Sequence, residues 1–394
     1  MATHRSHFYY RPVHAALEWI LSHLARRATK RPCAPISTIP RRVLFLKFGG
    51  IGEAVLARSI ADHLRARHPG MRIDMLVDAR TREAMTCESD ARVFCYDPRA
   101  DGLPAASRIL RAIRAAHYDA AIDFEQVSVL TAAFLYAGGI PVRVGFIPPG
   151  DERRRFFLSH AVDLREGESM WQAMNELGRI IDPSLPKELS ILPIPISATA
   201  AVHIDEWWQA NIGSDTGHVV AMHLGVGPRA QYRRWPLERF AELARRFKSR
   251  DHSLTIVFTG EQAERPLTEA FKALYDGRLV DATGLGSIQH SAALVERCDL
   301  LISADTGLMH LAAAMATPTV GIFGPNTPKC WAPVGQRAAF VYVTRVPCSP
   351  CINSYRRIIP DACFFTEKSR CMLDVSPEHV LKAARRVVRD RWLD

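Results

Sequence analysis

Residues 43–64, VLFLKFGGIGEAVLARSIADHL, decide the fold class of this chain. The first four residues form a short continuous apolar run, which is typical of a fully buried strand. Glycines follow at positions 49, 50 and 52, and apolar residues then recur at helical spacing as far as Leu64. A buried strand, a glycine turn and a helix in this order indicate a parallel sheet whose strands alternate with helices.

The same alternation continues beyond this stretch and restarts in the second half of the chain. Between the halves, Leu192-Pro-Ile-Pro-Ile196 favours a linker, because proline has no N–H to give to a helix or to a central strand. Each half is therefore predicted to be a doubly wound α/β unit. The predicted strands are residues 72–77, 93–96, 120–124, 219–222, 254–258, 300–302 and 319–323, and the predicted helices are 103–116, a segment ending at Tyr136, 236–247, 262–274, 287–297, 307–315 and 377–391.

These patterns predict four parts of the chain. They are a basic amphipathic arm (1–40), a first Rossmann-like domain (41–197), a second Rossmann-like domain (198–375) and a C-terminal helix (376–394). The last helix carries an apolar stripe, and we expect it to pack back on the first domain.

Composition and charge narrow the class of protein. With 394 residues, 48% of them hydrophobic and 23% charged, the chain suits two ordinary globular domains. The net charge is +10, and residues 1–42 supply seven of these charges through eight Lys or Arg and one Glu. After residue 42, basic and acidic residues nearly balance, which argues against a nucleic-acid partner. Nine scattered cysteines favour a reducing cytoplasm.

The basic arm has the pattern of an interfacial helix. Val13, Leu17, Ile20, Leu21 and Leu24 recur at helical spacing and are flanked by arginines and a lysine. Such a helix binds anionic lipid, which predicts attachment of the arm to a membrane surface. A helix packed on the body of the protein, or a leader without fixed structure, are the alternatives.

The turn Lys47–Glu53 is the first candidate for chemistry. In paired doubly wound domains the carboxyl ends of the strands face a common cleft, and ligands bind at the turns that follow them. Gly50 and Gly52 would let a ligand approach backbone N–H groups, and Glu53 places a carboxylate in the first helical turn. Taken alone, Glu53 is either a functional acid or an acid that complements the helix dipole.

Two later turns suit a phosphorylated ligand. The first runs from His223 to Pro236, where glycines follow a strand and arginines precede a helix, although a solvated basic loop is the alternative. The second is Ser303–His310, where a helix start offers free N–H groups to a phosphate. There Asp305 is alternatively an N-cap, and His310 a core histidine with satisfied hydrogen bonds.

Taken together, these segments resemble glycosyltransferase family 9, the ADP-heptose:lipopolysaccharide heptosyltransferases. The resemblance covers about residues 41–390 and rests on the order and spacing of Ile51-Gly-Glu53, Arg233-Arg-Trp-Pro236, Thr259-Gly260 with Glu264, Asp305-Thr-Gly-Leu-Met-His-Leu-Ala-Ala-Ala314 and Phe323-Gly-Pro325. It implies a GT-B architecture, in which two Rossmann-like domains face a central cleft. It also implies an inverting, metal-independent transfer of a heptose or related sugar from a nucleotide donor to a lipid-linked surface glycan.

The resemblance also implies roles for individual residues. Glu53 takes the place of the family's acid after Ile-Gly, which is the proposed base, and Arg233 takes that of the basic residue two positions before Trp-Pro, which contacts the donor phosphates. The family usually has Asp at the first position and often Lys at the second. Gly50 and Gly52 fall in the loop on the acceptor side. The residues expected to bind the donor are Gly225, Gly227, Arg233, Arg234, Glu264, Asp305, Thr306, Gly307 and His310.

No Asp-x-Asp occurs in the chain, so the usual carboxylate pair for a metal that bridges a diphosphate is absent. We therefore expect neither a catalytic metal nor a cofactor. We expect arginines to stabilise the leaving diphosphate instead. The Glu at position 53 keeps one alternative open, a catalytically weak GT-B module that binds a sugar nucleotide or scaffolds glycan assembly. A second alternative, a nucleotide-sugar epimerase of related fold, is disfavoured because Glu53 and Arg233 match the transferase and no epimerase motif is apparent.

A cluster of cysteines lies near the C-terminus. Cys348 and Cys351 are followed by Cys363 and Cys371. Four thiolates could close a tetrahedral zinc site, although the later spacings are irregular and family 9 members often have cysteines here without a metal.

Overall fold

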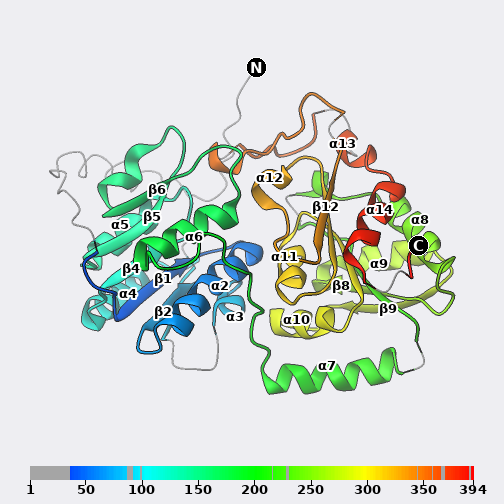
Figure 1. Cartoon of the computed structure of the whole chain (residues 1–394), viewed down its shortest axis with the longest axis horizontal. Helices are drawn as coiled ribbons and strands as arrows, with labels where there is room; N and C mark the ends of the chain where they lie inside the picture. The colour runs from blue at the N-terminus through cyan, green and yellow to red at the C-terminus, as the bar shows by residue number, and fades with distance from the viewer. Residues whose placement is uncertain are drawn as a thin grey trace. The chain divides into compact units, whose positions relative to one another are not determined.

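The computed structural model describes residues 36–86, 92–97, 100–214, 216–227, 230–343, 345–356, 358–364, 369–389 and 392–394. The chain divides into two compact units (Figure 1). Unit 1 runs to Ser190 and includes the later segment Ser354–Ile358, and unit 2 comprises Ile191–Asn353 and the chain from Ile359 onward. The interfacial helix predicted within residues 1–40 lies outside the described residues.

Unit 1 is built on a parallel sheet with the strand order β3-β2-β1-β4-β5-β6. Its strands are β1 (Arg42–Lys47), β2 (Arg72–Val77), β3 (Val93–Cys95), β4 (Ala120–Asp123), β5 (Val142–Ile147) and β6 (His160–Asp163). Its helices are α2 (Ile51–Arg67), α3 (Arg82–Met85), α4 (Leu103–Ala116), α5 (Val129–Ala137), α6 (Met170–Ile181) and the short 3₁₀ segments η1 (Glu152–Phe156) and η4 (Ser354–Arg356).

Strand β1 lies inside the sheet, between β2 and β4, so its apolar run is buried on both faces. Leu44 and Leu46 pack with side chains of α4 and α5, while α2 packs against α6. In the parallel register, Lys47 lies opposite Val77 of β2 and Leu46 opposite Asp123 of β4. The residues that follow these three strands therefore emerge at the same edge of the sheet.

Unit 2 repeats this plan, with the strand order β12-β11-β10-β7-β8-β9, all parallel. Its strands are β7 (Val219–His223), β8 (Thr255–Gly260), β9 (Arg278–Thr283), β10 (Leu300–Ala304), β11 (Thr319–Phe323) and β12 (Ala338–Tyr342). Its helices are α7 (Ala198–Asn211), α8 (Leu237–Lys248), α9 (Arg265–Lys272), α10 (Ile288–Glu296), α11 (Gly307–Ala314), α12 (Pro328–Trp331), α13 (Arg370–Leu373) and α14 (Pro377–Val387), with 3₁₀ segments η2 (Gln231–Arg233) and η3 (Gln262–Glu264).

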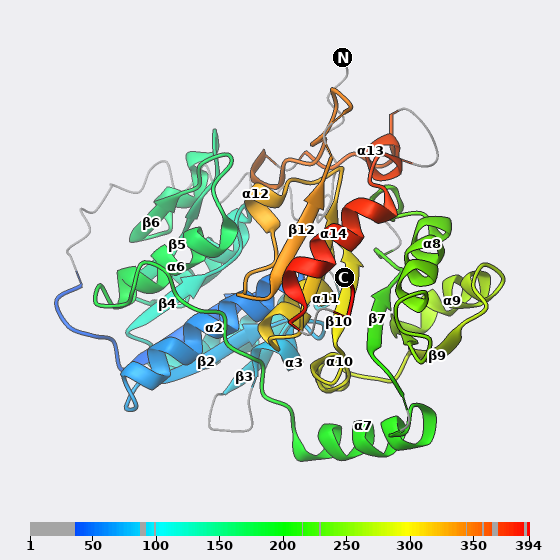
Figure 2. The same ribbon diagram turned by 45° about the vertical axis from the view of Figure 1, so that its right-hand side comes forward.

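The C-terminal helix α14 belongs to unit 2, so the expectation that it packs on the first domain is wrong. Its buried Val380, Leu381, Ala384 and Val387 join the core formed with α8 and the sheet, and it lies against β11 and β12 (Figures 1 and 2). An apolar stripe shows that a helix is buried, but it does not show which sheet the helix covers. Among the described helices, none is long and apolar enough to cross a membrane.

Candidate active site

Glu53 lies in the first turn of α2, directly after the end of β1. Gly50, which precedes the helix, has a φ of 68° and gives no side-chain cap. A Cβ atom at Gly50 would lie 3.1 Å from Cδ of Glu53. Glycine is therefore needed here both for the left-handed backbone and for the space that the carboxylate occupies. Gly52 is buried within the same turn.

The carboxylate of Glu53 is paired with Lys47 rather than acting only on the helix dipole. Lys47 ends β1, its side chain is 3% exposed, and Nζ contacts both Oε2 of Glu53 and, at 2.7 Å, Oε1 of Glu125. The side chain of Glu53 keeps 21% of its surface exposed. Glu125 was not predicted as a site residue from the sequence. Its position just after β4, the strand next to β1, is the signal that could have identified it.

These charges shift one another's protonation. Burial raises the pKa of Glu53, the ammonium of Lys47 opposes this, and the carboxylate of Glu125 adds to it. Burial lowers the pKa of Lys47, but the two carboxylates outweigh it, and the pKa lies well above its usual range. Lys47 therefore stays charged, and Glu53 is a stronger base than an ordinary glutamate while keeping part of its surface open.

In unit 2, Arg233 and Asp305 form an ion pair at the carboxyl end of the sheet. Nη1 of Arg233 lies 3.1 Å from Oδ2 of Asp305, and the same oxygen accepts from Nδ2 of Asn326 at 2.8 Å. Asp305 directly follows β10, Arg233 ends η2 and Asn326 follows β11. Asp305 is thus not the N-cap of α11. It aligns a guanidinium near the start of that helix, and Asn326 is a member of the cluster that sequence reasoning missed.

The start of α11 is open to an anion. Thr306 is its N-cap residue and makes no side-chain cap bond, and its hydroxyl lies 2.9 Å from that of Ser303. Gly307 is the first residue of the helix, so the backbone N–H groups that begin there are the free donors expected at a helix N-terminus.

His310 lies one turn further along α11 and is buried. Among the described residues its Nδ1 has no hydrogen-bond partner, so it is not a core histidine with satisfied hydrogen bonds. Burial lowers the pKa of His310 to about 4, against the opposing charge of Asp305. The ring is therefore neutral at physiological pH.

Arg234 and Glu264 form a second group in unit 2. Burial lowers the pKa of Arg234, which the charge of Glu264 opposes. Oε2 of Glu264 accepts from the N–H of Glu261 and lies 3.9 Å from Nδ1 of His223. A Cβ atom at Gly225 would fall 1.5 Å from the Glu264 carboxylate, so the glycine makes room for this acid. Gly227 has a φ of 74° and open space around it.

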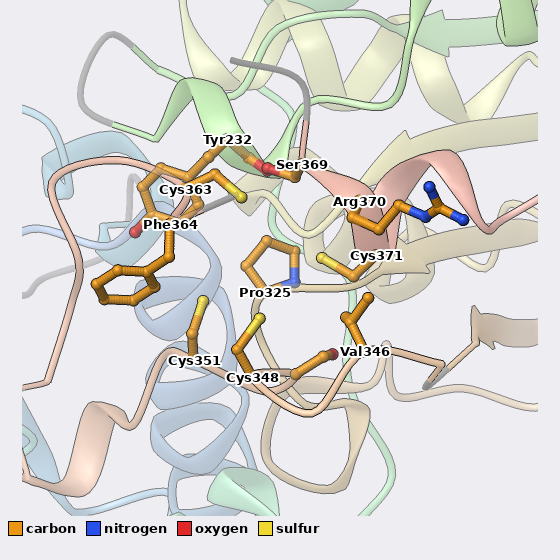
Figure 3. Close-up of a pocket in the computed structure, with 11 residues that line it drawn as sticks. Tyr232, Pro325, Val346, Cys348, Cys351, Cys363, Phe364, Ser369, Arg370 and Cys371 are labelled. Carbon is orange, nitrogen blue, oxygen red and sulfur yellow. The ribbon is translucent and has the colours of Figure 1, made fainter. Parts of the chain in front are cut away.

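The four C-terminal cysteines line one pocket (Figure 3). Cys348, Cys351, Cys363 and Cys371 surround Pro325, and none forms a disulfide. Burial raises the pKa of Cys351 to about 11 and of Cys371 to about 12, and neighbouring thiols add to both shifts. Within the part of the chain that the structure describes, no three His, Cys, Asp or Glu side chains are grouped so as to hold a metal ion.

The pocket is lined by Tyr232 and Pro325, the neighbours of Arg233 and Asn326 along the chain. Oγ of Ser349 donates to the carbonyl of Gly324 at 2.6 Å, and the N–H of Cys351 donates to that of Pro325 at 2.9 Å. Oγ of Ser369 donates to the carbonyl of Tyr232. The cysteine segment therefore braces the backbone next to both residues.

Two parallel six-stranded sheets with interleaved helices, and with polar residues gathered at the carboxyl ends of their strands, form a two-domain α/β fold of the GT-B class. The fold matches that of the E. coli ADP-heptose lps heptosyltransferase II (TM-score 0.67, 19% identity, 88% of this chain and 98% of that chain). It also matches a glycosyl transferase family 9 structure from Veillonella parvula (TM-score 0.74, 20% identity, 88% and 97%).

The sequence comparisons identify the family. The model of glycosyltransferase family 9 (heptosyltransferase) matches residues 106–358. Lipopolysaccharide heptosyltransferase 2 of Salmonella typhimurium is 22% identical over 353 residues, which cover 86% of this chain and 97% of that protein. The chain therefore belongs to glycosyltransferase family 9, and it is a glycosyltransferase.

Proposed function

We propose that this protein transfers a heptose from ADP-heptose to the core of lipopolysaccharide, with inversion and without a catalytic metal. The donor and acceptor are taken from the names of the relatives, a lipopolysaccharide heptosyltransferase 2 and an ADP-heptose lps heptosyltransferase II. The observation that carries the proposal is the partly exposed Glu53, which faces a buried ammonium at the carboxyl end of the unit 1 sheet.

In the proposed reaction Glu53 is the general base. It takes the proton from the acceptor hydroxyl while an electron pair of that oxygen forms the bond to the anomeric carbon. The bond from that carbon to the diphosphate breaks on the opposite face, and its electron pair leaves with ADP. The raised pKa of Glu53 suits a base, since proton transfer is most efficient when the pKa approaches the working pH.

The leaving diphosphate is assigned to unit 2. Arg233 and Arg234 offer guanidinium donors, and Thr306 and Gly307 open a helix whose N-terminus favours negative charge. His310, neutral and short of a partner at Nδ1, is available for a hydrogen bond to the donor. Fixed donors of this kind stabilise charge as it develops, which is the role a metal has where Asp-x-Asp is present.

We also propose that residues 1–40 bring the enzyme to the cytoplasmic face of the inner membrane. Apolar residues at helical spacing beside a cluster of arginines support this. Co-sedimentation with vesicles rich in anionic lipid, comparing the full chain with a form that starts at Pro40, should show loss of binding in the shorter form. Equal binding by both forms would refute the proposal.

The transfer itself is tested with the full chain, ADP-heptose and lipopolysaccharide from a strain whose core lacks heptose. Mass spectrometry should find the acceptor heavier by a heptose, and NMR should find the anomeric configuration opposite to that of the donor. Absence of transfer despite donor binding would favour the weakly catalytic module.

A further inference from the structure

Lys47 has a second carboxylate partner that the proposed mechanism does not use. Oε1 of Glu125 accepts from Nζ of Lys47 at 2.7 Å and from the backbone N–H of Phe48 at 2.9 Å. Nζ of Lys47 also donates to the carbonyl of Phe48 at 3.2 Å. Glu125 therefore holds the ammonium to the end of β1 independently of Glu53.

The backbone of Glu125 is held by a buried ion pair between Asp123 and Arg154. Its N–H donates to Oδ1 of Asp123 at 3.0 Å, and Oδ2 of Asp123 accepts from Nη2 of Arg154 at 2.9 Å. The side chains of Asp123 and Arg154 are fully buried. Glu125 consequently stands on a rigid support, as a group that positions a catalytic residue must.

We propose that Glu125 is the positioning residue that keeps Lys47 in place and paired while Glu53 gains and loses its proton. The proposal rests on the role of Glu53 as the base. When Glu53 accepts the proton from the acceptor hydroxyl, it becomes neutral and Lys47 loses that partner. A buried ammonium without a counter-charge is strongly unfavourable, and it would oppose the proton transfer. Glu125 counters this opposition, because its carboxylate is a second partner for Lys47, 2.7 Å from Nζ.

The described groups around Glu53 allow the charge of Glu125 to be changed without changing the base itself. They are Lys47 from β1, Glu125 from the segment after β4 and the neutral amide of Gln126. Asp78, at the same edge, accepts from the N–H of Gly49 at 3.0 Å and is paired with Arg80. Replacing Glu125 by Gln removes a negative charge from beside Glu53 and leaves Lys47 to Glu53 alone. Both changes favour the ionised form of Glu53 and make it a weaker base.

The test measures kcat and KM against pH for the full chain with ADP-heptose and heptose-deficient lipopolysaccharide. Glu125→Gln should move the acidic limb of the kcat profile to lower pH and reduce the plateau on the order of tenfold, with the KM for donor unchanged. Glu125→Asp, which keeps the charge, should leave the limb in place. The control is Glu176→Gln on α6, where the exposed carboxylate pairs with Arg179 one turn along the same helix, and it should behave as wild type.

The outcomes separate this inference from the proposed function. An acidic limb that stays in place in Glu125→Gln, with activity reduced only in proportion to the fraction of folded protein, would overturn the inference. If Glu125→Gln does not fold, a displaced limb in Glu125→Asp would overturn it instead. Glu53→Gln is measured alongside. Full turnover in Glu53→Gln would refute the assignment of Glu53 as the base. An inactive Glu53→Gln together with a wild-type pH profile in Glu125→Gln would refute only the role of Glu125.

Discussion

The neutral state of His310 makes the stability of unit 2 depend on pH. Burial lowers the pKa of His310 to about 4 in the folded protein from 6.5. Between these values the unfolded chain binds more protons than the folded one, so stability is full above pH 6.5 and falls as the pH drops towards 4. One pKa unit corresponds to about 1.4 kcal/mol, so the whole window amounts to about 3 kcal/mol, of which about 2 kcal/mol is lost by pH 5.

The perturbation is His310→Gln, which removes the titration and keeps a polar side chain. Urea unfolding at pH 7.5 and pH 5, followed by tryptophan fluorescence, gives the free energy of unfolding; one of the seven tryptophans, Trp331, has its ring centroid 6.4 Å from that of His310. We expect the wild type to lose about 2 kcal/mol more than the variant between the two pH values. An NMR titration of His310 should find its pKa near the same low value. Equal losses, or titration near pH 6.5, would refute this account of the burial.

Three further predictions follow from the site. Arg233→Ala should raise the Kd for ADP-heptose roughly 10- to 100-fold in calorimetry, as expected for the loss of a charge-assisted contact. The control, Arg239→Ala on α8, should not change this Kd. If Arg233→Ala binds ADP-heptose as tightly as the wild type, Arg234 takes the role of contacting the donor phosphates. Transfer should persist in EDTA, and activity abolished by the chelator and restored by Mg²⁺ or Mn²⁺ would refute metal independence. In alkylation by iodoacetamide followed by peptide mapping, the exposed Cys95 should react before Cys351 and Cys371, whose pKa burial raises to about 11 and 12; simultaneous reaction would contradict that burial.

The central strands could be predicted from the sequence because they are buried on both faces. β1, β7 and β10 read as continuous apolar runs, and each is followed by a turn and a helix of matching period. The strands missed by the pattern are mostly at or next to sheet edges. β6 reads His160-Ala-Val-Asp163 and β9 reads Arg278-Leu-Val-Asp-Ala-Thr283, because an edge strand keeps polar residues that hide the apolar run.

The candidate site was only partly predictable for a similar reason. Motif spacing located Glu53 and Arg233, since both lie in turns that directly follow or precede a regular element. Glu125 and Asn326 join them only through the strand order, which places the ends of β4 and β11 beside those of β1 and β10. No spacing along the chain shows that adjacency. Nor does it show that Gly225 makes room for the carboxylate of Glu264.

Glu53→Gln separates a general base from a residue that only binds, because turnover and donor affinity respond differently to it. Gln keeps the size and hydrogen bonding of Glu53 but cannot accept the proton. Turnover should fall by roughly 10²- to 10⁴-fold while the Kd for ADP-heptose stays unchanged, because the donor site lies on other residues. Glu53→Asp restores the acid usual in the family and should retain measurable activity. A Glu53→Gln variant that transfers heptose at the wild-type rate would contradict the assignment of the base. Transfer by Glu53→Asp but never by the parent chain would identify a silenced transferase.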